Sequence, residues 1–266
     1  MDFSQYVKGD ALEISNTTID ISELVSFLQD NAHITKLSLK STRIGDKGAE
    51  ALANLTYLTE LDLHGNKVGG KGAKALANLT HLTALGLRNN STGDRGAKAL
   101  ANLTHLTMLN LQGNKIGDKG AKALANLLNL TELYLDDNKI GDKGAEALAD
   151  LSNLTTLDLR ANKIGERGVK ALANGNFIHL TAIYLEGNTI SNKGTEKYIL
   201  TSLEKRCNRE REMEKRYQTK VAGSREASHP GSELDEVQPL DQLLSSLRFD
   251  GSNRTRTSNW PVSSRC

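Results

Sequence analysis

Residues 106–129 read LTMLNLQGNKIGDKGAKALANLLN, and this stretch recurs with small edits on both sides of itself. One asparagine column marks the period: its members are 24 residues apart, and the last copy follows after 26 residues. The column consists of Asn66, Asn90, Asn114, Asn138, Asn162 and Asn188. A fixed period of this size is typical of a solenoid, in which each unit buries its apolar face only against its neighbours.

The first half of the unit alternates apolar and polar residues, which predicts a strand with one buried face. Leu106, Leu109, Leu111 and Ile116 are expected to point inward. Asn114 follows where the chain turns, and its amide can bond backbone groups that a bent chain cannot pair by itself. We therefore interpret the asparagine column as structural.

The second half of the unit, GDKGAKALANL, predicts a short helix. Asp118 is the expected N-cap, since a carboxylate suits the positive end of a helix. Leu124 and Leu127 are expected to face the strands. A helix of about eight residues is marginal alone, so it depends on packing against its neighbours.

The full pattern, LxxLxLxxNxIGDxGAxALAxLxx, resembles the leucine-rich repeat of the 24-residue GALA type. The motif GAKALA or GAEALA occurs five times in one register, at 48–53, 72–77, 96–101, 120–125 and 144–149. The resemblance covers roughly residues 34 to 206. It implies an α/β leucine-rich-repeat solenoid, with a curved parallel sheet inside, short helices outside, and a disordered C-terminal tail.

The chain divides into four parts. Residues 1–33 form a degenerate copy, which we predict to be an N-terminal capping repeat with Ser22 as its helix N-cap. Seven repeats follow at 34–206, and 207–217 extends the C-terminal cap helix. Residues 218–266 contain all three prolines and many serines, which predicts a mostly disordered tail.

Within the tail, segment 239–249 has apolar residues at helical spacing. The leucines of this possible tail motif are Leu240, Leu243, Leu244 and Leu247. Such a short helix can dock in a partner's groove or fold back on its own solenoid, and the sequence leaves both alternatives open.

The sequence contains no recognisable catalytic motif. There is no GxSxG, HExxH or P-loop motif, so we expect no enzyme activity, no catalytic residues and no cofactor. Four histidines, His33, His81, His105 and His179, share one column at the turn into a strand. No cysteine or carboxylate completes a metal site there, so we interpret them as polar turn residues.

A basic column lies on the expected helix side, with acidic neighbours in most copies. Its members are Lys47, Lys71, Arg95, Lys119, Lys143, Arg167 and Lys193. Phosphate binding is one interpretation, and a solvated face neutralised by its own aspartates is the one we favour.

Composition excludes several classes of partner. The net charge is +2, which favours no nucleic-acid partner. No apolar run of about 18 residues occurs, so we expect no membrane insertion. The N-terminus lacks the features of a signal peptide, and the only two cysteines lie far apart. These features predict a cytoplasmic protein, which we expect to be a monomer.

In a leucine-rich repeat, the outward strand residues line the concave face. These positions vary along this chain while the core positions do not, so specificity can be encoded there. Repeats five to seven place tyrosines beside charged residues, a composition typical of interaction hot spots. We predict that a protein partner binds at Glu132, Tyr134, Asp136, Asp137, Asp158, Arg160, Tyr184 and Glu186.

These features predict a protein–protein interaction module. The GALA resemblance further implies a bacterial effector that acts on a host protein and enters the host cell without a classical signal peptide. Residues 1–33 leave no room for the F-box of many such effectors, which argues against a ubiquitin-ligase adaptor. The alternative is an intracellular structural or regulatory scaffold. A GTPase-activating role has little support, since no arginine stands apart from the repeat.

Overall fold

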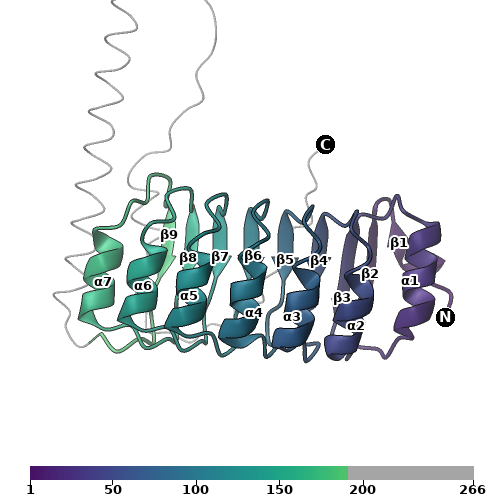
Figure 1. Ribbon diagram of the computed structural model, residues 1–266, viewed down its shortest axis with the longest axis horizontal. Coiled ribbons are helices and arrows are strands. Elements are labelled where there is room, and N and C mark those ends of the chain that lie inside the picture. The colour runs from purple at the N-terminus through teal and green to yellow at the C-terminus, as the bar shows by residue number, and fades with distance from the viewer. Residues whose placement is uncertain (191–266) are drawn as a thin grey trace, which may run out of the picture.

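A computed structural model describes residues 1–190 of the chain (Figure 1). The second half of the last repeat lies outside these residues. So do the predicted helix extension 207–217, the tail 218–266 and its segment 239–249, with Leu240, Leu243, Leu244 and Leu247.

The described strands form one sheet of nine in sequence order. Strand β1 pairs antiparallel with β2, and every later pair is parallel. Equivalent residues pair directly, as in Leu109 with Leu133 and Leu133 with Leu157. The strands are β1 (Val7–Lys8), β2 (Ala11–Ser15), β3 (Lys36–Lys40), β4 (Glu60–Asp62), β5 (Ala84–Gly86), β6 (Met108–Asn110), β7 (Glu132–Tyr134), β8 (Thr156–Asp158) and β9 (Ala182–Tyr184).

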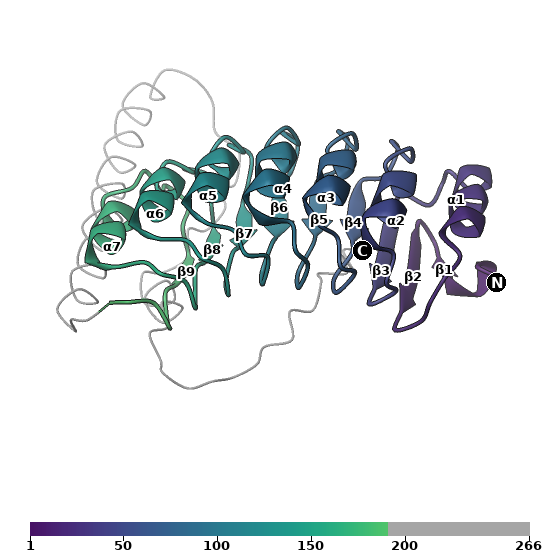
Figure 2. The ribbon, with the colours of Figure 1, turned by 60° about the horizontal axis from the view of Figure 1, so that its bottom comes forward.

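One row of helices covers one face of this sheet (Figure 1). They are α1 (Ile21–Asp30), α2 (Gly45–Leu52), α3 (Gly70–Leu76), α4 (Gly93–Leu100), α5 (Asp118–Leu124), α6 (Asp142–Leu148) and α7 (Glu166–Ala173), after a 3-10 turn at Ser4–Tyr6. Figure 2 shows the helices following the outer side of an arc, with the strands inside it. The predicted solenoid is confirmed, and the sheet face that the helices leave uncovered is called the open face below.

The core fills the space between the sheet and the helices. Leu106, Leu109, Leu111 and Ile116 are fully buried, as are the helix-side Leu124 and Leu127. Equivalent leucines of every described repeat belong to the same continuous core. The period-two and helical patterns therefore predicted the buried residues correctly, because each repeat has the same packing problem.

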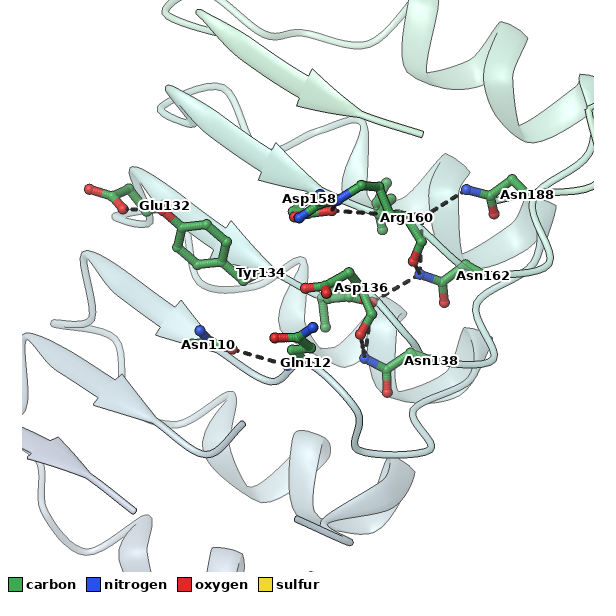
Figure 3. Close-up of polar contacts among 12 residues, drawn as sticks. Asn110, Gln112, Glu132, Tyr134, Asp136, Asn138, Asp158, Arg160, Asn162 and Asn188 are labelled. Carbon is green, nitrogen blue, oxygen red and sulfur yellow. Dashed lines mark hydrogen bonds and ion pairs between the residues drawn. The ribbon is translucent and has the colours of Figure 1, made fainter. Parts of the chain in front are cut away.

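The asparagine column bonds backbone groups of two consecutive repeats (Figure 3). The Asn138 amide donates to the carbonyls of Leu111 and Leu135, both at 2.9 Å. Its oxygen accepts the backbone N–H groups of Asn114 at 3.1 Å and Ile116 at 2.8 Å. Buried backbone groups that the short strands leave unpaired are thereby satisfied, which confirms the structural role.

The N-terminal part contains β1, β2 and α1, and it corrects one prediction. The N-cap of α1 is Asp20, not Ser22, because the extended Asp20 places its carboxylate over the first turn. That carboxylate accepts the N–H groups of Ser22 at 2.9 Å and Glu23 at 3.2 Å. The ring of Phe3 lies 5.6 Å from that of Phe27 and is buried at this end of the array. Strand β1 was not predicted, because a strand of two residues is too short to show an alternating pattern.

The predicted N-cap role of Asp118 is also wrong for its own helix. Asp118 is the first residue of α5, whose N-cap is Gly117. The Asp118 carboxylate instead accepts backbone N–H groups of Gly141 and Gly144 in the next repeat. The reason is geometric: at the first helical position, the side chain points across to the neighbouring helix end, where N–H groups are also unpaired.

Candidate protein-binding face

The outward residues of the strands form ladders across the open face. In the central ladder, Asn110 pairs with Tyr134, Tyr134 with Asp158, and Asp158 with Tyr184. Two tyrosines therefore flank Asp158 on adjacent strands. Parallel strands lie about 4.8 Å apart, so the two tyrosine backbones are separated by roughly 10 Å.

Asp158 and Arg160 form an ion pair on this face (Figure 3). The arginine Nε lies 2.9 Å from Oδ1 and 3.0 Å from Oδ2, and Nη2 also donates to Oδ2. The Asp158 oxygen Oδ1 also accepts the backbone N–H of Arg160 at 3.1 Å. Asp158 is only 2% exposed. It therefore holds Arg160 in place and is not an open surface charge.

The two tyrosines are half-buried and each is oriented by a charged residue. The Tyr134 hydroxyl donates to Glu132 Oε2 at 2.7 Å. Burial and this acidic partner raise the pKa of Tyr134, so its hydroxyl stays protonated as a donor. The Arg160 guanidinium carbon lies 5.3 Å from the centre of the Tyr184 ring, within the range of a cation–π contact. Both rings are thus ordered on the open face before any partner arrives.

Asp136 is a buried carboxyl beside this group. It is 8% exposed, and burial followed by the neighbouring Asp158 carboxylate raises its pKa to about 7. Arg160 and Arg88 oppose this shift through their charges, and the backbone N–H of Asp136 bonds its carboxyl. At neutral pH, a large fraction of Asp136 is therefore protonated.

Glu186 and Asp137 complete the predicted set. Burial raises the pKa of Glu186, and its Oε2 is buried without a hydrogen-bond partner among residues 1–190. Asp137 is exposed at the turn after β7, with a left-handed φ of 55°. The eight predicted residues thus lie on three neighbouring strands and the turns after them. They bring five carboxyl groups and one guanidinium onto the open face.

A second polar cluster on the open face was not predicted. Asp62 is buried on β4, where Lys40 Nζ lies 3.3 Å from its carboxylate and the backbone N–H of His64 donates at 3.0 Å. Burial raises the pKa of Asp62 and lowers that of His64. Asp158 likewise accepts the backbone N–H two residues later, from Arg160. The cation of Asp62 comes from the neighbouring strand, whereas that of Asp158 is the residue two later on the same strand.

The histidine column has the predicted role of polar turn residues. His81 Nδ1 lies 3.1 Å from the carbonyl of Thr56, and His105 Nδ1 lies 3.1 Å from that of Thr80. Asn129 occupies the next position and donates to Thr104 at 2.8 Å. Among the described residues, no group of three or more His, Cys, Asp or Glu is placed to hold a metal ion.

The basic column is exposed on the helix side of the described repeats. Its aspartate neighbours do not neutralise it in the way we expected. Asp46, Asp94, Asp118 and Asp142 accept backbone N–H groups of the next repeat instead. A helix end offers two N–H groups at fixed positions, whereas an exposed lysine must lose side-chain entropy to form an ion pair.

The fold and the open face define a repeat solenoid with an ordered polar surface on its sheet. A family model described as "Leucine rich repeat" matches residues 32–92 and 104–164. A solved Listeria monocytogenes structure, internalin C2, is 31% identical, with a TM-score of 0.55, and covers 70% of this chain and 75% of its own. The chain belongs to the leucine-rich repeat proteins.

Two further solved structures are similar. The Listeria monocytogenes internalin inlF is 27% identical, with a TM-score of 0.51, over 64% of this chain and 47% of its own. A plant ice-binding protein shares the fold at 20% identity and a TM-score of 0.50, over 67% of this chain and 57% of its own. This chain therefore spans less than two thirds of either protein. No curated protein matches it in sequence.

The leucine-rich repeat is a fold of the protein-interaction type, and the internalins are bacterial examples of it. No helix in the part of the chain that the structure describes is long and apolar enough to cross a membrane.

Proposed function

We propose that this protein binds a protein partner on the open face at β7, β8 and β9, without catalysis of its own. The observation that carries the proposal is the ladder Tyr134–Asp158–Tyr184. Core packing does not require tyrosine at outward positions, where other repeats have Gly86 or Ser38. Two ordered aromatic rings about 10 Å apart present large contact area with little entropy left to lose.

The charge of this face defines the surface that fits it. Five carboxyl groups surround the tyrosines, and the one guanidinium is already paired with Asp158. A basic or amide-rich partner surface complements such a face, and charge complementarity mainly speeds association and selects the partner. The chain acts in this proposal as a monomer with one binding face.

We further propose that the protein is a bacterial effector of the GALA type that engages a host protein. The internalin likeness supports a bacterial origin, and the five GALA motifs support the type. Delivery to the host without a classical signal peptide belongs to the same proposal. The alternative remains a scaffold that stays in the cytoplasm of the cell that makes it.

Capture of a partner by the full chain tests the proposal. Immobilised protein is incubated with eukaryotic and with bacterial lysate, and the bound protein is identified. The Tyr134→Ala, Tyr184→Ala variant should lose binding by at least about thirtyfold, since one hot-spot tyrosine alone contributes about 2 kcal/mol or more. The matched control, Lys119→Ala with Lys143→Ala, changes the helix side and should bind normally.

The outcomes are distinct. Capture from eukaryotic lysate alone supports the effector, and capture from bacterial lysate alone supports the scaffold. Unchanged binding by the tyrosine variant, with lost binding by the lysine variant, would move the site to the helix side. Both variants must retain the melting temperature of the parent chain.

A further inference from the structure

Asp136 is a buried carboxyl that has no paired cation among the described residues. It is more than nine-tenths buried, on the edge of the tyrosine cluster. Arg160, a neighbouring cation, is bound by both carboxylate oxygens of Asp158. No ion pair joins Asp136 to any described residue, and the hydrogen bond to its carboxyl comes from its own backbone. Buried charges in proteins are normally paired, so an ionised Asp136 would be stabilised by an external cation.

A second acceptor lies on the other side of Arg160. Asp136, Arg160 and Glu186 occupy equivalent positions after β7, β8 and β9, and the charges of both acids act on Arg160. Glu186 Oε2 is buried and has no hydrogen-bond partner within residues 1–190. One unsatisfied acceptor, Glu186 Oε2, and one buried carboxyl without a paired cation, Asp136, therefore lie on the same side of the tyrosine ladder.

Resting on the proposed function, we propose that Asp136 receives an arginine side chain of the protein partner and that this contact releases a proton from the site. A guanidinium presents several N–H donors in one plane, which suits the two oxygens of a carboxylate. It is also less strongly hydrated than an ammonium, so it enters a mostly buried position more readily. The Tyr134 ring offers a surface for it to stack on.

Binding of the guanidinium to protonated Asp136 releases one proton. In the free chain, a protonated Asp136 carries no charge, and the arriving guanidinium carries one positive charge. Contact favours the ionised carboxylate, so the acid proton passes to solvent while the guanidinium keeps its own protons. The O–H bond of the acid breaks, and N–H···O⁻ hydrogen bonds form.

The surroundings of Asp136 identify it as the group that titrates. The charged groups near it are Asp158 and Arg160 from β8 and, further away, Arg88 from the turn after β5. Glu186 acts through Arg160 from the far side. On β6 and the turn after it, the neighbouring Asn110 and Gln112 carry no charge. With its pKa at about 7, Asp136 is mostly protonated at pH 6 and mostly ionised at pH 8.

The test uses the full chain and a short probe. The peptide acetyl-Gly-Arg-Gly-amide is titrated in, and the Asp136 side-chain carbon signal is followed by NMR as a function of pH. Matched peptides carry lysine or the neutral citrulline in place of arginine. The arginine peptide should lower the pKa of Asp136 and bind about tenfold more weakly at pH 6 than at pH 8, as the ionised fraction predicts.

Two variants separate a specific site from general attraction to an acidic face. Asp136→Asn should bind the arginine peptide weakly and with no dependence on pH between 6 and 8. Glu146→Gln, which neutralises an exposed carboxylate of α6 in the same repeat, should behave as the parent chain.

Several results would overturn the proposal. They are an Asp136 signal that the arginine peptide does not move, equal effects of arginine and citrulline, and stronger binding of the lysine peptide. The proposed function fails separately. A captured partner that needs Tyr134 and Tyr184 but binds equally at pH 6 and pH 8 leaves the function standing and removes this inference. A partner that ignores the tyrosines removes the function.

Discussion

The carboxylate of Asp118 accepts a hydrogen bond of 2.7 Å from the backbone N–H of Gly141, which is the N-cap residue of the next helix. The same oxygen accepts the N–H of Gly144 at 3.0 Å. This repeat thus caps the helix that follows it. The same pair of bonds runs from Asp46 to α3, from Asp94 to α5, and from Asp142 to α7.

The exceptions show that the aspartate determines how the next helix begins. In the repeat before α4, Gly70 takes the place of the capping aspartate, so no carboxylate is available there. Gly93, at the start of α4, has a left-handed φ of 57°. Helix α2 follows the divergent first unit, and Gly45 at its start has a φ of 60°. Where an aspartate is present, the glycine at the same place is extended, as Gly141 is at φ −104°.

The first prediction is that Asp118→Ala destabilises the chain by about 1–2 kcal/mol, because the cap of α6 is lost. The amides of Gly141 and Gly144 should exchange with solvent faster, while those of α5, which contains residue 118, should change little. Lys119→Ala, the exposed neighbour, is the control for stability and should leave the midpoint of denaturant unfolding unchanged. Faster exchange in α5 rather than α6 would contradict capping between repeats.

The second prediction concerns the core. Leu111→Ala or Leu135→Ala removes a fully buried strand leucine from a close-packed interior and should cost about 2–5 kcal/mol. Because each repeat is stabilised by its neighbours, the loss should also weaken the adjacent repeats. Leu128→Ala provides the matched control, since that leucine is 60% exposed. Unfolding of either core variant at the parent's melting temperature would refute the assigned core.

The repeat made much of this fold predictable. Each unit of the sequence can be checked against the next one. The buried positions of Leu109, Leu111 and Asn114 could therefore be assigned from their recurrence alone. The direction of a capping hydrogen bond could not be predicted from the recurrence. Asp118 has the same place in the pattern whether it caps its own helix or the next one, and only the spacing of stacked helices decides between them.

The candidate site was predictable in its membership and not in its internal pairing. Alternation showed that Tyr134, Asp158 and Tyr184 share one face, and the ladder has that order. The sequence did not show that Arg160 turns back onto Asp158, since Asp136 and Glu186 are equally available to it along the same column. That pairing appears only in the structure, where Asp158 Oδ1 accepts both the backbone N–H and the Nε–H of Arg160. It leaves Asp136 without the cation.

The third prediction concerns this choice. Arg160→Ala leaves the buried Asp158 carboxylate without its cation and should cost about 1–3 kcal/mol. Adding Asp158→Asn should recover part of this loss, because the amide keeps an acceptor for the backbone N–H of residue 160 without a charge. A double-mutant cycle on unfolding free energy measures the coupling. Coupling close to zero would mean that the pair contributes no stability.

The ion pair between Asp158 and Arg160 also determines which charge-reversal variant can test electrostatic steering of a partner toward the open face. Asp158→Lys would place a cation against Arg160 in a buried position, so it would disturb the fold as well as the charge. Asp137→Lys reverses an exposed charge on the same face. It should slow association and weaken its dependence on salt, with little change in dissociation. A change confined to the dissociation rate would argue against steering.

The last prediction is that Asp136→Asn stabilises the chain increasingly as pH rises from 4 to 7. The pKa of Asp136 is raised from 3.8 to about 7, so between these values the folded state binds more protons than the unfolded state. Stability from this group therefore falls as pH rises through that window, by at most about 4 kcal/mol, and is constant above it. Asparagine cannot ionise, so the variant lacks this contribution. The difference in unfolding free energy between variant and parent should thus grow between pH 4 and pH 7 and then level off. Glu146→Gln, which changes an exposed carboxylate of the same repeat, should give a nearly flat difference. A flat difference for Asp136→Asn as well would show that the carboxyl ionises normally in the folded chain.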